Sequence, residues 1–420
     1  MRRLLLATLP LACLVGAIPL NAQDLTSAIA DALANAPAVE AADAGEKAAQ
    51  ARVDQARAEG NPLARIEGSA GKGYIDNGNF FGLSADDTTP VAAQAVAEMP
   101  LYTGGRVSSA IDQAKGGAAV ASAQAVQARS RTVVQTVKAY TDVLTARKLE
   151  QSYGTLAGEL REVERQASLR YKVGEIASTE VAQARARRAE AEAGLAQAQG
   201  KRASAEAAYQ RLTGKPAGDL APLPPPPPIP ESLDAALDLA HENNPALQQA
   251  AQAVKIAEAG SRSARAEGMP MVSAYAEAAH VRDQFFPGYK ADSVSVGLRG
   301  RWTVFGGGRV AAKVRAADAD QLAAEARERD ARLTVDGMVI DAWQGYQTAE
   351  RMLDAARLRR DAAAEALRGT KLEAKVGAKP TLAVLDAERE AIEAESALLE
   401  AESQYQLAAW QLNALTGNLP

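Results

Sequence analysis

Two stretches of this chain, "RYKVGEIASTEVAQARARRAE" (170–190) and "LEAKVGAKPTLAVLDAEREAI" (372–392), contain the same turn. Each places Lys-Val-Gly between two long, polar, alanine-rich runs. Alanine is the best helix former, and glycine suits the left-handed residue that ends a helix. The pattern therefore predicts two helical hairpins, with tips near 173–179 and 376–381.

The same offset of 203 residues relates other parts of the chain. "LYTGGRV" (101–107) matches "VFGGGRV" (304–310), and "LTG" at 212–214 matches "LTG" at 415–417. Upstream, "ARAEGNP" (56–62) matches "ARAEGMP" (264–270) at an offset of 208. The spacing therefore changes once, between 62 and 106, as expected for a loop that tolerates insertion. The chain is a tandem duplication.

The repeats define the expected domains. The first repeat covers 23–220 and the second covers 232–420. A proline-rich linker at 221–231 joins them, and its five consecutive prolines favour an extended strut.

Residues 1–22 read as a secretory signal peptide. Arg2 and Arg3 precede an apolar run, and Ala22 offers a small residue for cleavage. The alternative is a lipoprotein signal that ends at Cys13, and the sequence leaves lipidation of Cys13 open. Since Cys13 is the only cysteine, disulfide frameworks and thiolate metal sites are excluded from the mature chain. The net charge of −5 gives no sign of a nucleic-acid partner.

Four segments alternate with the period of two that is typical of strands: about 63–74, 91–102, 271–281 and 292–305. In the last one Val294 and Val296 share one face, opposite Ser293 and Ser295. This length and alternation fit a transmembrane β-barrel with a wet lumen, and the alternative is a half-buried soluble sheet. Four strands leave bare edges, so several chains would have to share one barrel.

Aromatic residues favour the membrane interpretation. All five phenylalanines lie in or beside these strand pairs, where they could form interfacial girdles with tyrosine and tryptophan. The residues concerned are Phe80, Phe81, Phe285, Phe286, Phe305, Tyr74, Tyr102, Tyr289 and Trp302.

Glycine-rich turns connect the strands to the long helices. We expect Gly104-Gly105-Arg106 and Gly307-Gly308-Arg309 to redirect the chain from strand to helix. The helical patterns that follow, about 107–172 and 310–375, would each span roughly 100 Å. The predicted fold class is an α+β membrane protein with an internal tandem duplication.

In their order, these features resemble the TolC-like outer-membrane factor family across essentially the whole mature chain. The resemblance implies a homotrimer in the cell outer membrane. Each chain gives four strands to a shared transmembrane β-barrel, and long antiparallel helices continue it as an α-barrel in the periplasm. The implied function is a passive exit duct for type I protein secretion or multidrug efflux, without a cofactor. The implied partners are outer-membrane lipid, a periplasmic adaptor (membrane fusion) protein and an inner-membrane ABC or proton-driven transporter.

The resemblance also implies roles for residues at the two tips. Adaptor hairpins would dock at Val173, Gly174, Val376 and Gly377. Asp386 would line the selectivity ring of the periplasmic entrance, and Lys379 and Glu180 would form a tie that holds the gate closed.

Two positions depart from the family pattern. Ala383 stands where a second acid of the entrance ring is expected, and Ala374 stands where a tyrosine takes part in the latch. These departures predict an entrance with half of its ring carboxylates and a loosely held gate.

Two other classes of protein compete with the duct. A periplasmic adaptor would carry compact lipoyl-like and barrel domains, and a structural coiled-coil protein would lack amphipathic strands. An enzyme is disfavoured because neither His241 nor His280 has a neighbouring nucleophile or ligand cluster in the sequence. The sequence does not identify the cargo, because in the family that the chain resembles the inner-membrane partner mainly selects it.

Overall fold

The computed structural model describes residues 23–75, 86–284 and 288–419. The predicted signal peptide at 1–22 lies outside this range, and so do Phe80, Phe81, Phe285 and Phe286. The described part of the predicted aromatic girdle includes Trp302 and Phe305, which are both exposed.

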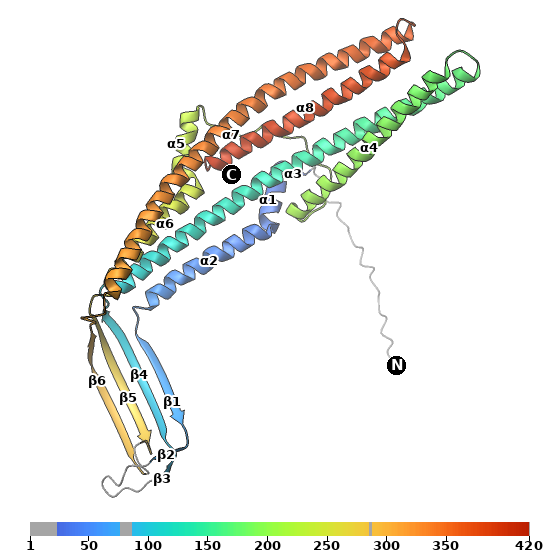
Figure 1. Cartoon of the computed structure of the whole chain (residues 1–420). Helices are drawn as coiled ribbons and strands as arrows, with labels where there is room; N and C mark the ends of the chain where they lie inside the picture. Colours follow the sequence, from blue (N-terminus) through green and yellow to red (C-terminus); the bar gives the residue numbers. More distant parts are fainter. Residues whose placement is uncertain (1–22, 76–85, 285–287, 420) are drawn as a thin grey trace, which may run out of the picture. The chain divides into compact units, whose positions relative to one another are not determined.

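Both repeats run through the same order of elements (Figure 1). Two helices lead into two long strands, and a very long helix then turns back into a shorter one. The first repeat contains α1 (Leu25–Asn35), α2 (Pro37–Ala58), β1 (Leu63–Ala70), β4 (Val91–Tyr102), α3 (Arg106–Lys172) and α4 (Ser178–Thr213). The second contains α5 (Leu233–Asn243), α6 (Pro245–Ala266), β5 (Met271–Arg282), β6 (Lys290–Arg301), α7 (Arg309–Lys375) and α8 (Thr381–Leu415).

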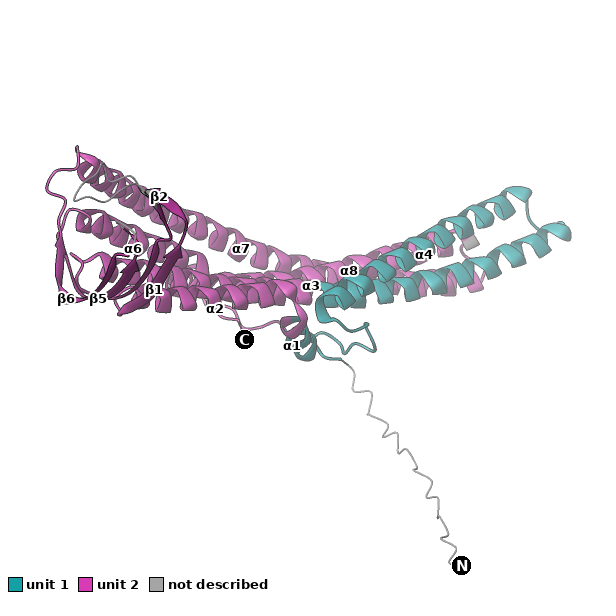
Figure 2. Ribbon diagram, turned by 90° about the horizontal axis from the view of Figure 1, so that it is seen from below, with its two compact units in different colours: residues 1–32, 139–225 teal, residues 33–138, 226–420 magenta. Residues whose placement is uncertain are grey.

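The chain divides into two compact units that do not coincide with the repeats (Figure 2). One unit comprises 1–32 with 139–225, and the other comprises 33–138 with 226–420. The second unit contains all four long strands and the α7–α8 hairpin. The first contains the α3–α4 hairpin tip.

The four long strands form one antiparallel sheet in the order β1-β4-β5-β6. Its two faces differ in chemistry. One carries exposed apolar side chains, such as Ile66 (85% exposed), Val294 (82%) and Leu298 (70%). On the other face Gln94 donates to Glu277 at 2.6 Å and the Arg299 guanidinium lies 4.5 Å from the Tyr275 ring centre. The alternation expected from the sequence is present.

Two strand ends differ from the sequence-based expectation. β1 ends at Ala70, and 73–75 instead pairs with 86–88 as a small separate sheet, β2 (Gly73–Ile75) with β3 (Asp86–Thr88). β6 ends at Arg301 rather than 305. Arg301 pairs with Met271, the first residue of β5, so β6 has no partner on that strand beyond this point. The next residue, Trp302, donates its indole N–H to the carbonyl of Gly268 at 3.1 Å.

Within the described residues, no helix has a stretch that is long and apolar enough to cross a membrane.

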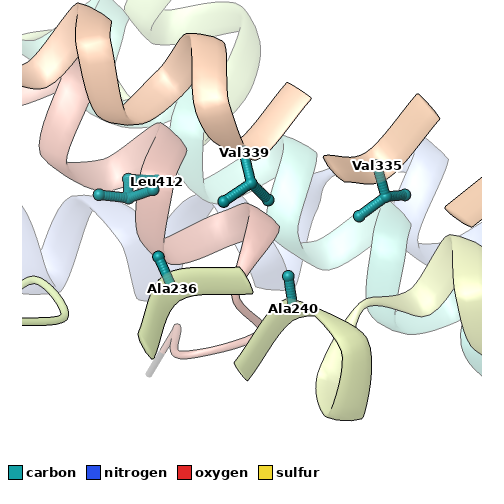
Figure 3. Close-up of a cluster of buried hydrophobic side chains, with 5 residues drawn as sticks. All are labelled: Ala236, Ala240, Val335, Val339 and Leu412. Carbon is teal, nitrogen blue, oxygen red and sulfur yellow. The ribbon is translucent and has the colours of Figure 1, made fainter. Parts of the chain in front are cut away.

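A small apolar cluster joins the short helix α5 to the long helices α7 and α8 (Figure 3). Ala236 and Ala240 of α5 lie against Val335 and Val339 of α7, and Leu412 of α8 completes the cluster. All five side chains are buried, and the alanines allow the close approach of α5. Beside this cluster, the amide of buried Asn413 donates to the carbonyl of Pro228 at 3.1 Å, which fixes the proline-rich linker to α8.

The other unit has a core built around two tyrosines. Tyr140 of α3 and Tyr209 of α4 are almost fully buried, with ring centres 6.3 Å apart. The Tyr140 hydroxyl lies 2.8 Å from the carbonyl oxygen of Gln23 and 2.7 Å from that of Ala221. It therefore holds the start of the described chain and the start of the linker against the hairpin.

Tyr140→Phe is expected to destabilise this unit by about 0.5–1.5 kcal/mol, because it removes the hydrogen bond that the single proton of this hydroxyl makes with a backbone carbonyl. Burial also raises the pKa of Tyr140 from 10.0 to about 12. Unfolded tyrosine loses its proton near pH 10 while folded Tyr140 keeps it, so this contribution to stability is complete below pH 10 and is lost as the pH rises towards 12.

Thermal unfolding followed by circular dichroism between pH 8 and pH 12 measures both effects. The exposed Tyr171→Phe is the control and should unfold like the parent. If Tyr140→Phe keeps the parent's stability and its alkaline loss, the assigned role of the hydroxyl is wrong.

Candidate functional site

The two hairpin tips have the same backbone structure. In the first tip the N–H of Gly174 donates to the carbonyl of Tyr171 (3.0 Å), and that of Glu175 to Arg170 (2.9 Å). In the second tip Gly377 donates to Ala374 (3.1 Å), and Ala378 to Glu373 (2.9 Å). These bonds satisfy the last carbonyl groups of α3 and α7, as is usual where a left-handed residue ends a helix.

Glycine is needed at both turns because the backbone is left-handed there. Gly174 has φ +79° and Gly377 has φ +76°, a region that costs other residues roughly 1–2 kcal/mol. The valine before each glycine is strongly exposed, 71% for Val173 and 80% for Val376. Each tip therefore presents one exposed apolar side chain next to a glycine in the left-handed conformation.

The tips differ in the charges that follow the shared turn. In the second hairpin, Lys379 Nζ lies 2.8 Å from Glu373 Oε2. In the first hairpin, Arg170 Nε lies 3.0 Å from Glu175 Oε2. Glu180, in the first turn of α4, makes no ion pair within the part of the chain that the structure describes, so the predicted tie between Glu180 and Lys379 stays a prediction.

Asp386 is exposed on α8, while its neighbours on that helix point inward. Leu385 is buried, and buried Glu388 lies 2.8 Å from Lys371 of α7. The side chain of Asp386 is therefore exposed in the single chain. Its role in an entrance ring is untested and stays a prediction.

Glu180 and Ala383 are equivalent residues of the two tips. The N–H of Glu180 donates to Ala177 and that of Ala383 donates to Pro380, each at 3.1 Å, so these two residues occupy the same place in their repeats. The first tip therefore has an acid where the second tip has an alanine. The duplication has preserved the backbone of the turn and changed its charges.

The strand-to-helix turns are also alike in the two repeats. Gly104 and Gly105 have φ +62° and +91°, and Gly307 and Gly308 have φ +59° and +79°. Arg106 and Arg309 are the first residues of α3 and α7. At both turns the chain thus passes through two consecutive left-handed glycines before the helix begins.

The sequence did not reveal a charged cluster beside these turns. Glu267, which follows α6, is hydrogen-bonded to Lys313 of α7. This bond, with the nearby charges of Arg309 and Arg106, holds the pKa of Glu267 below its ordinary value. The repeated Glu59 and Glu267 in the "ARAEG" motifs were the available signal, but their partners lie on distant elements.

A subunit with four amphipathic strands and two long hairpins with exposed tips belongs to the class of outer-membrane duct proteins. A family model described as "Outer membrane efflux protein" matches residues 28–215 and again 236–418. The chain therefore belongs to the outer membrane efflux protein family, and the two matches confirm its duplication. This is a family of trimeric outer-membrane channels, not of enzymes.

Similar proteins agree with this assignment. Outer membrane efflux protein BepC of Brucella suis biovar 1 (strain 1330) is 28% identical over 297 residues, which are 69% of this chain and 63% of BepC. The match thus spans less than two thirds of that relative's length.

Solved structures share the fold at low sequence identity. CmeC of Campylobacter jejuni superposes with a TM-score of 0.81 at 16% identity, covering 94% of this chain and 85% of its own. CusC gives 0.79 at 19% identity, with 94% and 92% covered. VceC of Vibrio cholerae gives 0.77 at 20% identity, with 94% and 96% covered. The TolC-like fold predicted from the sequence is confirmed.

Proposed function

We propose that three copies of this chain form a passive efflux duct across the outer membrane. The observation that carries the proposal is the four-stranded sheet. Its order β1-β4-β5-β6 leaves one side of β1 and one side of β6 unpaired within the described part of the chain, while one sheet face is apolar and exposed. In lipid, unpaired backbone groups cost several kcal/mol each, so β6 of one copy would pair with β1 of the next.

The long helices support the same arrangement. Large apolar residues are exposed along α7 in the single chain: Leu322, Leu333, Leu358 and Leu372. An exposed apolar row on a long helix marks a surface that another protein covers. In the proposed trimer a neighbouring copy covers it, and the polar sheet face lines the passage.

The tips are the proposed periplasmic entrance. Exposed Val173 and Val376 would receive the hairpins of a periplasmic adaptor, which connects the duct to an energy-coupled transporter of the inner membrane. Efflux is favoured over protein secretion because the family and BepC are both described as outer membrane efflux proteins. The duct contributes no energy of its own in this scheme.

Cysteine cross-linking tests the proposed trimer directly, since the mature chain is expected to contain no cysteine of its own. Ser69→Cys on β1, combined in turn with single cysteines along β6, should give disulfide-linked trimers in outer-membrane extracts. Cysteines on the inner strand β4, such as Gln94→Cys, should not form such links. A chain that is extracted as a soluble monomer and never cross-links would refute the proposal.

Asp386→Asn is expected to reduce the preference of the open duct for cations. One carboxylate per chain gives three in a trimer, so the field at the entrance is modest and the effect should be a partial loss. The reversal potential in a salt gradient measures it. Asp361→Asn on α7 is the control, and an unchanged potential for Asp386→Asn would remove this residue from the entrance ring.

A further inference from the structure

Gln23 becomes the first residue of the exported chain if the signal peptide is cut after Ala22. We propose that Gln23 is cyclised to pyroglutamate in the mature protein and that the Tyr209 hydroxyl promotes this step. The inference rests on the predicted removal of 1–22 during export, and it does not depend on assembly of the proposed duct.

The backbone of Gln23 is fixed by a parallel bridge with Leu220. Its N–H donates to the carbonyl of Asp219 at 2.9 Å, and the N–H of Ala221 donates to its carbonyl at 3.0 Å. The buried Tyr140 hydroxyl lies 2.8 Å from the same carbonyl. The first mature residue is therefore an ordered part of the fold, with its nitrogen held in one place.

The side chain of Gln23 is held through its oxygen alone. The hydroxyl of Tyr209, a residue that is 1% exposed, donates a hydrogen bond to Oε1 of Gln23, and the two oxygens are 3.3 Å apart. The amide nitrogen Nε2 makes no hydrogen bond to any residue that the structure describes. Gly218 passes close by, since a Cβ built on it would lie 3.9 Å from Cδ of Gln23.

Cyclisation uses these groups without any other reactant. The α-amine nitrogen attacks Cδ, a bond forms between them, the Cδ–Nε2 bond breaks, and Nε2 leaves as ammonia with a proton from the amine. A hydrogen bond from the Tyr209 hydroxyl to Oε1 stabilises the negative charge that develops on that oxygen during the attack.

The product keeps a carbonyl oxygen that can accept a hydrogen bond from the Tyr209 hydroxyl, as Oε1 does in the structure. The group that is lost, Nε2, is the one without a hydrogen bond to the described residues. Cyclisation also replaces an α-ammonium, whose ordinary pKa is about 7.7–8.0, with a neutral amide, and this removes the cost of holding a charge in a half-buried site.

Mass spectrometry of the exported protein tests the proposal. Trypsin releases the N-terminal peptide 23–47, which we expect to be lighter than the encoded peptide by one ammonia molecule. A peptide that begins at Gln23 with a free amine would overturn the proposal, and so would a mature chain that begins at another residue. Single-channel conductance of the same preparation tests the proposed duct independently of this modification.

A time course after a pulse of export tests the part assigned to Tyr209. Tyr209→Phe should accumulate the lactam severalfold more slowly than the parent, while the exposed Tyr171→Phe in the same hairpin should match the parent. Circular dichroism checks that the Tyr209 variant is folded. Equal rates for all three proteins would show that the hydroxyl has no part in the step.

Discussion

Replacing Gly104 with alanine is expected to destabilise the protein much more than the same change at Gly307. The two glycines are equivalent in the two repeats and have nearly equal φ angles, +62° and +59°. Both variants place a side chain on a left-handed backbone, at a cost of roughly 1–2 kcal/mol. Only at Gly104 would the new Cβ also collide with a neighbour, since it would lie 2.3 Å from Cβ of Met269.

Relief of this collision requires the α6–β5 connection to move, because Cβ of Met269 is fixed to the backbone. The carbonyl oxygen of Ala266 would also lie only 3.3 Å from the new atom. Overpacking of this kind adds about 1–3 kcal/mol. At Gly307 no atom lies within 4 Å of the equivalent position, so that variant bears the backbone cost alone.

Thermal unfolding of the two purified variants gives the comparison. We expect the midpoint of Gly104→Ala to fall well below that of Gly307→Ala, which itself falls below the parent. Equal midpoints would contradict the close packing of the first strand-to-helix turn against the start of β5.

Lys379→Glu is expected to raise the conductance of the duct severalfold while leaving its stability nearly unchanged. Lys379 and Glu373 form an exposed ion pair, and such pairs contribute only about 0–1 kcal/mol. Reversing this charge places two carboxylates side by side at the tip and also removes the proposed tie to Glu180. The hairpin should then favour an open position.

Single-channel recordings measure this effect, and Lys375→Glu provides a matched control. Lys375 is exposed at the end of α7, carries the same charge and has no ion pair within the described part of the chain. It should conduct like the parent. A conductance of Lys379→Glu that does not exceed the parent value would show that Lys379 is not part of a gate.

Charge exchange identifies the partner of Lys379 in the closed tip. Combining Lys379→Glu with Glu180→Lys should restore low conductance if the tie joins the two tips. Combining it with Glu373→Lys should restore low conductance if the pair within the α7–α8 hairpin closes the gate. If neither double variant restores low conductance, the charge of Lys379 has no role in closing the tip.

The sequence predicted the features that depend on local chemistry. The Lys-Val-Gly motifs predicted the turns at Gly174 and Gly377, because glycine favours the left-handed conformation that ends a helix. The repeated motifs predicted the duplication. The alternation of Val294 and Val296 with serine identified the apolar face of β6. In each case the residues that decide the structure lie within a few positions of one another.

Features that depend on distant partners could not be predicted. β6 ends at Arg301 because its partner there, Met271, is the first residue of β5, and Trp302 then bonds to Gly268, which lies 34 residues earlier in the chain. The ion pair of Lys371 with buried Glu388 and the cluster around Glu267 also join separate elements. The resemblance predicts a tie between Lys379 and Glu180, and within the single chain Lys379 forms an ion pair with Glu373.

The central claim is that this chain builds a channel through the outer membrane from three copies of itself. The most direct test adds the purified, detergent-extracted protein to a planar lipid bilayer and records current at fixed voltage. The account predicts discrete, equal steps of conductance from a preparation whose mass is that of a trimer. A preparation that remains monomeric and produces no steps would contradict it.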